Sequence, residues 1–131
     1  MTTIEAMVLV LLGGFGGGTA RFFLSGVIAN RIGETFPWGT LFVNVTGALL
    51  IGLLAGLGRM DGGVFADPRF SSLFVPGFCG GYTTVSSFSL QTLNLALDGE
   101  NRLAVLNVAI SVVLCIIAVV IGFQAATAIT P

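Results

Sequence analysis

Charged residues are too sparse in this chain to cover a surface that faces water. Only 8% of its 131 residues are charged, while 55% are hydrophobic, and the mean hydropathy is +1.03. Soluble domains carry charge on about a quarter of their residues, so a soluble globule is excluded, and a disordered chain is excluded by the apolar content. A formal net charge of −1 offers no basic patch, so no nucleic-acid partner is expected. An integral membrane protein, with the lipid bilayer as its partner, remains.

Charged and turn-forming residues divide the chain into four apolar stretches. A membrane-spanning helix needs about 20 residues, so a chain of this length holds four helices and little else. The sequence therefore predicts an all-α membrane protein, one transmembrane domain over residues 1–131, with spans at about 4–29, 38–58, 71–97 and 103–129. The first stretch lacks a positively charged start, so we expect it to be a span and not a cleaved signal peptide.

The arginines beside the spans give no preferred orientation in the membrane. Arg31 and Arg102 flank the first and third turns, and Arg59 and Arg69 flank the middle loop. This count is two against two, so the positive-inside rule does not choose a direction. Two interpretations stay open on the count alone: the protein inserts both ways and pairs with an inverted copy, or a weak remaining bias orients every molecule.

The first span combines a glycine cluster with an intramembrane arginine. Residues 13–18 read Gly-Gly-Phe-Gly-Gly-Gly, a pattern that lets helix backbones approach closely. Arg21 follows within one turn, and an arginine in an apolar run normally faces protein or water. The alternative is that Arg21 extends to the membrane interface. Because the chain has no histidine and only two isolated cysteines, Cys79 and Cys115, a histidine/cysteine metal site is excluded.

Small and polar residues recur at every fourth position of the second span. The stripe consists of Thr40, Asn44, Ala48, Gly52 and Gly56. Residues four apart share one face of a helix, and small ones allow close packing. The amide of Asn44 can donate two hydrogen bonds, which suits an anion. Asn44 can equally make an interhelical hydrogen bond that only fixes the packing.

The third span is predicted to be broken and then lined with hydroxyl groups. Pro76, Gly77 and the pair Gly80–Gly81 predict a helix break, whose freed backbone groups need protein, water or an ion as partners. Six hydroxyl side chains follow within eight residues, namely Tyr82, Thr83, Thr84, Ser86, Ser87 and Ser89. A helix facing lipid would not carry these groups, so they indicate a polar path or a crowded interface.

Three motifs recur in the order found in a known family. Residues 37–44 (Pro-Trp-Gly-Thr-Leu-Phe-Val-Asn), residues 80–88 (Gly-Gly-Tyr-Thr-Thr-Val-Ser-Ser-Phe) and the first-span glycines ending in Ala-Arg-Phe resemble the fluoride channels known as Fluc or CrcB. The resemblance covers all four spans. It implies an antiparallel, dual-topology homodimer with two pores, which conducts fluoride passively out of the cell through the plasma (inner) membrane.

The resemblance also assigns roles to individual residues. It implies a fluoride pore lined by Thr40, Asn44, Thr84, Val85, Ser86, Ser87, Phe88, Gln91 and Ser111. Arg21 matches an arginine near the aqueous vestibule. The backbone carbonyls of Gly80 and Thr83, from both subunits, match the ligands of a structural sodium ion (Na⁺). Val85 stands where the family usually has phenylalanine, and Gln91 stands where it often has glutamate, so one aromatic contact and one charge are missing.

Two other classes of membrane protein have this size. A small dual-topology multidrug or cation exporter also has four short helices, but proton-coupled export needs a carboxylate inside the membrane. Glu5, at the start of the first span, is the only acid within any span. A structural subunit with glycine-rich packing would not need a break followed by hydroxyl groups. No catalytic constellation is evident, so we do not expect an enzyme.

Overall fold

The computed structural model describes residues 1–60 and 62–129, and every regular element in these ranges is helical. Three unbroken helices, long and apolar enough to cross a bilayer, are α1 (Thr3–Ile32), α2 (Trp38–Leu57) and α6 (Asn101–Ile129). The remaining span is divided into α3 (Pro68–Ser72), the π-helical segment η2 (Leu73–Cys79), α4 (Gly80–Tyr82) and α5 (Val85–Leu97). A short 3₁₀ helix, η1 (Val64–Ala66), lies in the middle loop. The all-helical fold and the break in the third apolar stretch are therefore confirmed, whereas only three of the four predicted spans form helices long and apolar enough to cross a membrane. Asp61, Thr130 and Pro131 lie outside the described residues.

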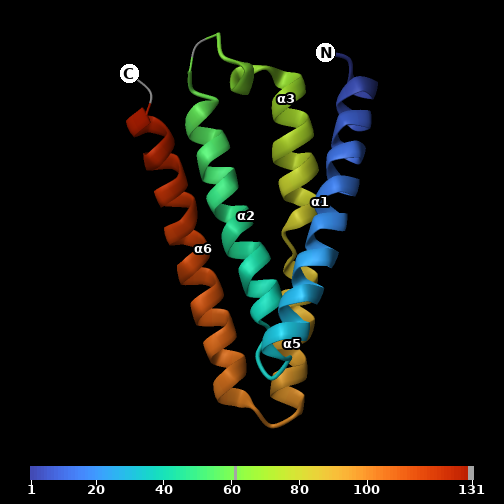
Figure 1. The fold of residues 1–131 in the computed structure, drawn as a ribbon, viewed down its shortest axis with the longest axis vertical. Coiled ribbons are helices and arrows are strands. Elements are labelled where there is room, and N and C mark those ends of the chain that lie inside the picture. The colour runs from blue at the N-terminus through green and yellow to red at the C-terminus, as the bar shows by residue number, and fades with distance from the viewer. Residues whose placement is uncertain (61, 130–131) are drawn as a thin grey trace.

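Local signals explain where the spans begin and end. Thr2 and Glu5 form a reciprocal capping box that starts α1, and this helix ends at Gly33, whose φ of 92° favours glycine. Asp67 caps α3, and Gly99, with φ of 82°, forms the turn between α5 and α6. The turns after α1 and α5 lie at one end of the bundle, and the loop between α2 and α3 lies at the other (Figure 1). The alternation of loops that the arginine count assumed is therefore present.

Glycines hold the four spans together in two close pairs. In the first pair, α2 packs against α6, where a Cβ atom on Gly52 would overlap the carbonyl of Val119 and one on Gly122 would overlap that of Leu49. In the second pair, α1 packs against η2 and α4, with Gly13 and Gly17 directly against the partner backbone. Dispersion contacts drive helix association in lipid, so removing side chains at these crossings brings the backbones into contact.

The break in the third span begins at Thr83, three residues after Gly80, where the pair Gly80–Gly81 predicted it. Gly80 has helical angles (φ −63°, ψ −37°), and the backbone becomes extended only at Thr83 (φ −82°, ψ 160°) and Thr84 (φ −152°, ψ 123°). Gly81 stays helical because it packs against the backbone of Gly14 on α1. Pro76 lies inside η2, and the wider π-helical turn accommodates a residue that has no N–H to donate.

Candidate functional site

Asn44 on α2 holds the break in the third span. Its Nδ2 donates to the carbonyl of Thr84 at 2.9 Å, and the N–H of Thr84 donates to its Oδ1 at 2.7 Å. One side chain thus satisfies both backbone groups of an extended residue that has lost its helical partners. The interhelical hydrogen bond considered for Asn44 therefore exists, and one N–H of its amide stays available.

Thr84 starts the second half of the span. It is the N-cap of α5, and its Oγ1 accepts from the N–H of Ser87 at 3.1 Å and lies 3.2 Å from the hydroxyl of Ser86. The N-terminus of a helix carries partial positive charge, and its first N–H groups lack helical partners. The break therefore places hydroxyl groups and a positive helix end at the same point.

The same hydrogen bonds free two backbone carbonyls on the other side of the break. In an unbroken helix the N–H of Thr84 would donate to Gly80 and that of Ser87 would donate to Thr83. Here those N–H groups donate to Asn44 and to the Thr84 hydroxyl instead. The two carbonyls released are those that the resemblance assigned to sodium. The hydrogen bonds of Asn44 and Thr84, and not the flexibility of the glycines, release them.

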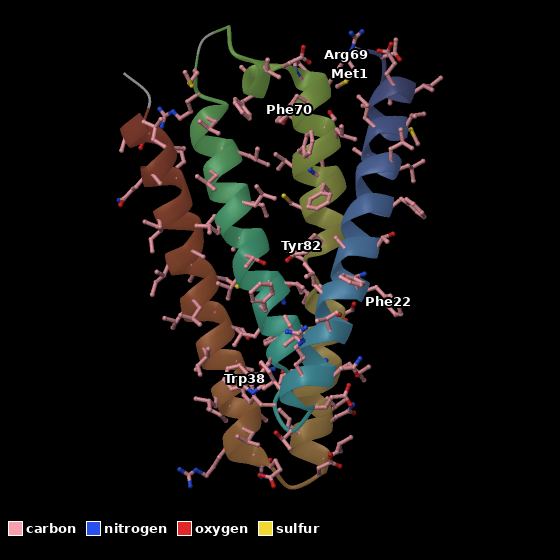
Figure 2. The ribbon with its side chains drawn as sticks, viewed as in Figure 1. Met1, Phe22, Trp38, Arg69, Phe70 and Tyr82 are labelled. Atoms are coloured by element: carbon pink, nitrogen blue, oxygen red, sulfur yellow. The ribbon has the colours of Figure 1, made fainter. Side chains whose placement is uncertain are left out.

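Arg21 reaches the break from α1. Its Nη1 lies 3.5 Å from the carbonyl oxygen of Thr83, and the side chain is half-buried. The guanidinium therefore faces protein, as one of the two interpretations of an intramembrane arginine predicted. The neighbouring Phe22 points away from the bundle and is 83% exposed, whereas Tyr82 points inward between α2 and the third span (Figure 2). The carbonyl of Thr83 keeps a second lone pair for another partner.

A cavity of about 820 Å³ lies between the C-terminal end of α1, the start of α2 and the face of α5. Three predicted pore residues line it together: Thr40, Ser87 and Gln91. The Oε1 atom of Gln91 is buried and has no hydrogen-bond partner among the described residues. Carboxyl-bearing Glu34 and Asp98 also line the cavity, near the turns that end α1 and α5. Polar groups from three helices thus meet in one hollow.

The other predicted pore residues lie outside this cavity. Val85 is 76% exposed, Ser86 is exposed and Phe88 is half-buried on α5. A Cβ atom built on Gly80 would have only a carbonyl of its own segment 4.0 Å away. Part of the predicted pore, at Val85 and Ser86, and the backbone at Gly80 are thus exposed in the single chain, whereas Thr83 is half-buried.

Two polar contacts were not predicted from the sequence. Asn107 on α6 is only 2% exposed, and its Nδ2 donates to the hydroxyl of Thr92 on α5 at 2.9 Å, while Ser111 donates to its Oδ1 at 3.4 Å. The hydroxyl groups of Thr46 and Tyr82 lie 2.8 Å apart. The spacing of Asn107 and Ser111, four residues apart in a strongly apolar helix, is the signal that could have revealed the first contact.

The profile of one protein family, described as "CrcB-like protein, Camphor Resistance (CrcB)", matches residues 8–123. This range includes the glycine cluster, the break and the polar residues of all four spans. The chain belongs to the CrcB family. The family resemblance stated from the three motifs is therefore confirmed.

Named relatives of this CrcB chain carry a common description. A protein of Brucella abortus biovar 1 (strain 9-941), named "Fluoride-specific ion channel FluC 4", is 56% identical over 121 residues, or 92% of this chain and 91% of the relative. "Fluoride-specific ion channel FluC 2" of Rhodopseudomonas palustris (strain BisB18) is 55% identical, with 94% of each chain covered. "Fluoride-specific ion channel FluC" of Rhodospirillum rubrum is 49% identical, with 93% and 95% covered.

Proposed function

We propose that this CrcB protein is a fluoride-specific channel that conducts the ion passively through the membrane. The observation that carries the proposal is the break at Thr83–Thr84, where the amide of Asn44, hydroxyl groups and a helix N-terminus gather in the middle of an apolar bundle. The relatives' names point to the same ion. Apart from the Arg21 guanidinium, the donors at the break are neutral, and neutral donors bind an anion without trapping it.

Fluoride is a small and strongly hydrated anion, so a path through the membrane must replace its water with hydrogen-bond donors. The cavity lined by Thr40, Ser87 and Gln91 offers two hydroxyl groups and an amide to an entering ion. The buried Oε1 of Gln91, which has no partner among the described residues, is suited to accept a hydrogen bond from the ion's hydration water, while Nε2 donates to the anion. Several moderate contacts allow an ion to bind and to leave again.

The open face of the chain supports assembly with an inverted copy. Val85 is 76% exposed, and Ser86 lies on the same exposed end of α5. The Ser86 hydroxyl pairs with that of Thr84 at 3.2 Å, but an exposed polar group that faces lipid is still unfavourable. A second copy would cover this face, and the balanced arginine count permits the inverted orientation. In this homodimer Val85, Ser86 and Phe88 line the pore where the two copies meet.

The freed carbonyls support a structural sodium ion between the copies. The carbonyl oxygens of Gly80 and Thr83 would hold it, because the backbone N–H groups that would pair with them in a helix donate elsewhere. The Thr83 carbonyl would bind the ion through the lone pair that Nη1 of Arg21, at 3.5 Å, does not use. Carbonyl oxygens suit hard cations, and the cation would offset the repulsion between dipoles brought together from two copies. No group of three or more His, Cys, Asp or Glu side chains among the described residues competes for a metal.

The alternative, a proton-coupled multidrug or cation exporter, lacks the acid that it needs. Glu5 lies at the start of α1, accepts from the N–H of Thr2 at 2.8 Å and pairs with Arg69 at 3.8 Å. Figure 2 shows Arg69 beside Met1 at the end of the bundle. A carboxylate held in this way at a helix end is not a proton carrier at mid-membrane.

We place the chain in the plasma (inner) membrane, where passive efflux lowers cytoplasmic fluoride.

We expect fluoride to leave loaded proteoliposomes without any proton gradient. Purified protein is reconstituted, the vesicles are loaded with potassium fluoride, and valinomycin supplies the counter-ion path. A fluoride electrode then records efflux at equal pH on both sides, with chloride-loaded vesicles as the control. Rapid fluoride efflux with retained chloride is the expected result. Efflux that starts only when a pH gradient is imposed, or equal loss of both anions, would contradict the proposal.

A further inference from the structure

A buried chain of hydrogen bonds joins α5 to α6 beside the proposed pore. Asn107 lies at its centre and is 2% exposed; its Nδ2 donates to the hydroxyl of Thr92 at 2.9 Å. The hydroxyl of Thr92 in turn donates to the carbonyl of Phe88, one turn back on α5, at 2.7 Å. On α6 the hydroxyl of Ser111, itself 7% exposed, donates to Oδ1 of Asn107 at 3.4 Å.

We infer that Asn107 is a positioning residue for the pore, acting through Thr92 and Ser111. The inference rests on the proposed function, because it takes Phe88 and Ser111 as residues that line the fluoride path. A serine hydroxyl has one proton, and here that proton points to Asn107. Asn107 therefore sets the position of the Ser111 hydroxyl before an ion arrives, and this proton turns from Asn107 when it donates to the ion. Through Thr92 it also holds the α5 turn that carries Phe88.

The position of Asn107 explains why an amide is needed at this point. The hydroxyl of Thr92 donates its one proton in a hydrogen bond to the Phe88 carbonyl, so it can only accept a hydrogen bond from a residue on α6. The hydroxyl of Ser111 donates to Asn107, so Asn107 must also offer an acceptor. An amide supplies a donor group and an acceptor group from a single buried side chain, whereas leucine supplies neither and an aspartate carboxylate supplies only acceptors. Asparagine is thus matched to both neighbours at once.

A positioning role and a purely structural role predict different results for Asn107→Leu. A single interhelical hydrogen bond contributes little to the stability of a membrane protein, so the folded dimer should persist. Fluoride flux should fall about tenfold, the loss expected when a residue that supports a site is removed. Val108→Leu is the matched control, because the adjacent side chain on α6 is 41% exposed and is expected to leave flux unchanged.

Two substitutions at Thr92 test the connection to α5. Thr92→Val keeps the shape but removes the hydroxyl that accepts from Asn107, so flux should fall as in Asn107→Leu. Thr92→Ser keeps the hydroxyl, so this variant should retain most of the flux that Thr92→Val loses. The double variant Asn107→Leu/Thr92→Val should lose less flux than the product of the two single losses, because both substitutions remove the contact between Asn107 and Thr92.

The experiment measures fluoride efflux from proteoliposomes and the thermal midpoint of each purified variant. The inference predicts reduced flux at a nearly unchanged midpoint for Asn107→Leu, retained flux for Thr92→Ser, and non-additive losses. It is overturned if flux follows the midpoint in every variant, or if Asn107→Leu conducts normally. Ser111→Ala and Phe88→Ala are measured in parallel. Normal flux in both of these would refute the proposed pore lining itself, which separates that failure from a failure of the inference.

Discussion

Replacing Asn44 with aspartate is expected to abolish fluoride flux. The aspartate would keep the size of the side chain, but an oxygen would replace the Nδ2 that donates to the Thr84 carbonyl at 2.9 Å. Two acceptors would then face each other at the break, and a negative charge would stand beside the path of an anion. In a poorly solvated site such a charge costs several kcal/mol, so flux should fall by about a hundredfold or more.

Efflux from proteoliposomes measures this effect, and size-exclusion chromatography shows whether the variant keeps the oligomeric state of the original protein. Asn101→Asp is the matched control, because Asn101 is exposed at the start of α6 and the same chemical change there should leave flux intact. Near-normal flux through Asn44→Asp would show that Asn44 serves only to pack α2 against the third span.

Adding one methyl group at Gly17 is expected to prevent assembly of the bundle. A Cβ atom at this position would overlap the carbonyl oxygen of Phe78 and would lie 2.8 Å from the backbone nitrogen of Tyr82. Backbone atoms cannot move aside as a flexible side chain can, so α1 would have to separate from η2 and α4. Overpacking of this kind costs about 1–3 kcal/mol or more, and the contact with the break would be lost as well.

Gly16→Ala is the control for Gly17→Ala. A Cβ atom on Gly16 would meet only the side chain of Phe78, at 3.8 Å, which is an ordinary contact. Alanine also favours a helix over glycine by about 1 kcal/mol, so this variant should be as stable as the original chain. The yield of monodisperse protein in detergent measures both variants. Equal yields from the two would show that α1 does not pack against the third span through Gly17.

The spans could be predicted from the sequence, because their ends are local features. Capping residues such as Thr2 and Asp67 and turn glycines such as Gly99 act within a few residues, so composition and spacing locate them. The place of the break could not be predicted in this way. Gly80 and Gly81 suggested it, but the side chain of Asn44, 40 residues away in the chain, determines that the helix opens at Thr84. A tertiary contact of this kind leaves no local signal.

The candidate site shows the same limit. The roles of Thr40, Ser87 and Gln91 were predicted separately, and the structure brings them together around one cavity. Asn107 was not predicted, because its only local signal, the spacing of four residues from Ser111, does not identify Thr92 on α5 as its partner. The replacement of the usual phenylalanine by Val85 stays without a structural consequence here, because this side chain lies on the open face of the single chain.

A well-resolved structure of the protein in lipid, prepared in sodium, tests the proposed arrangement most directly. We expect two inverted copies related by a two-fold axis, with density for one ion on that axis between the Gly80 and Thr83 carbonyls of both copies. Exchanging sodium for a large organic cation should remove this density. Two copies in the same orientation, or an axis where apolar surfaces pack and every carbonyl is bonded within its own helix, would contradict the account.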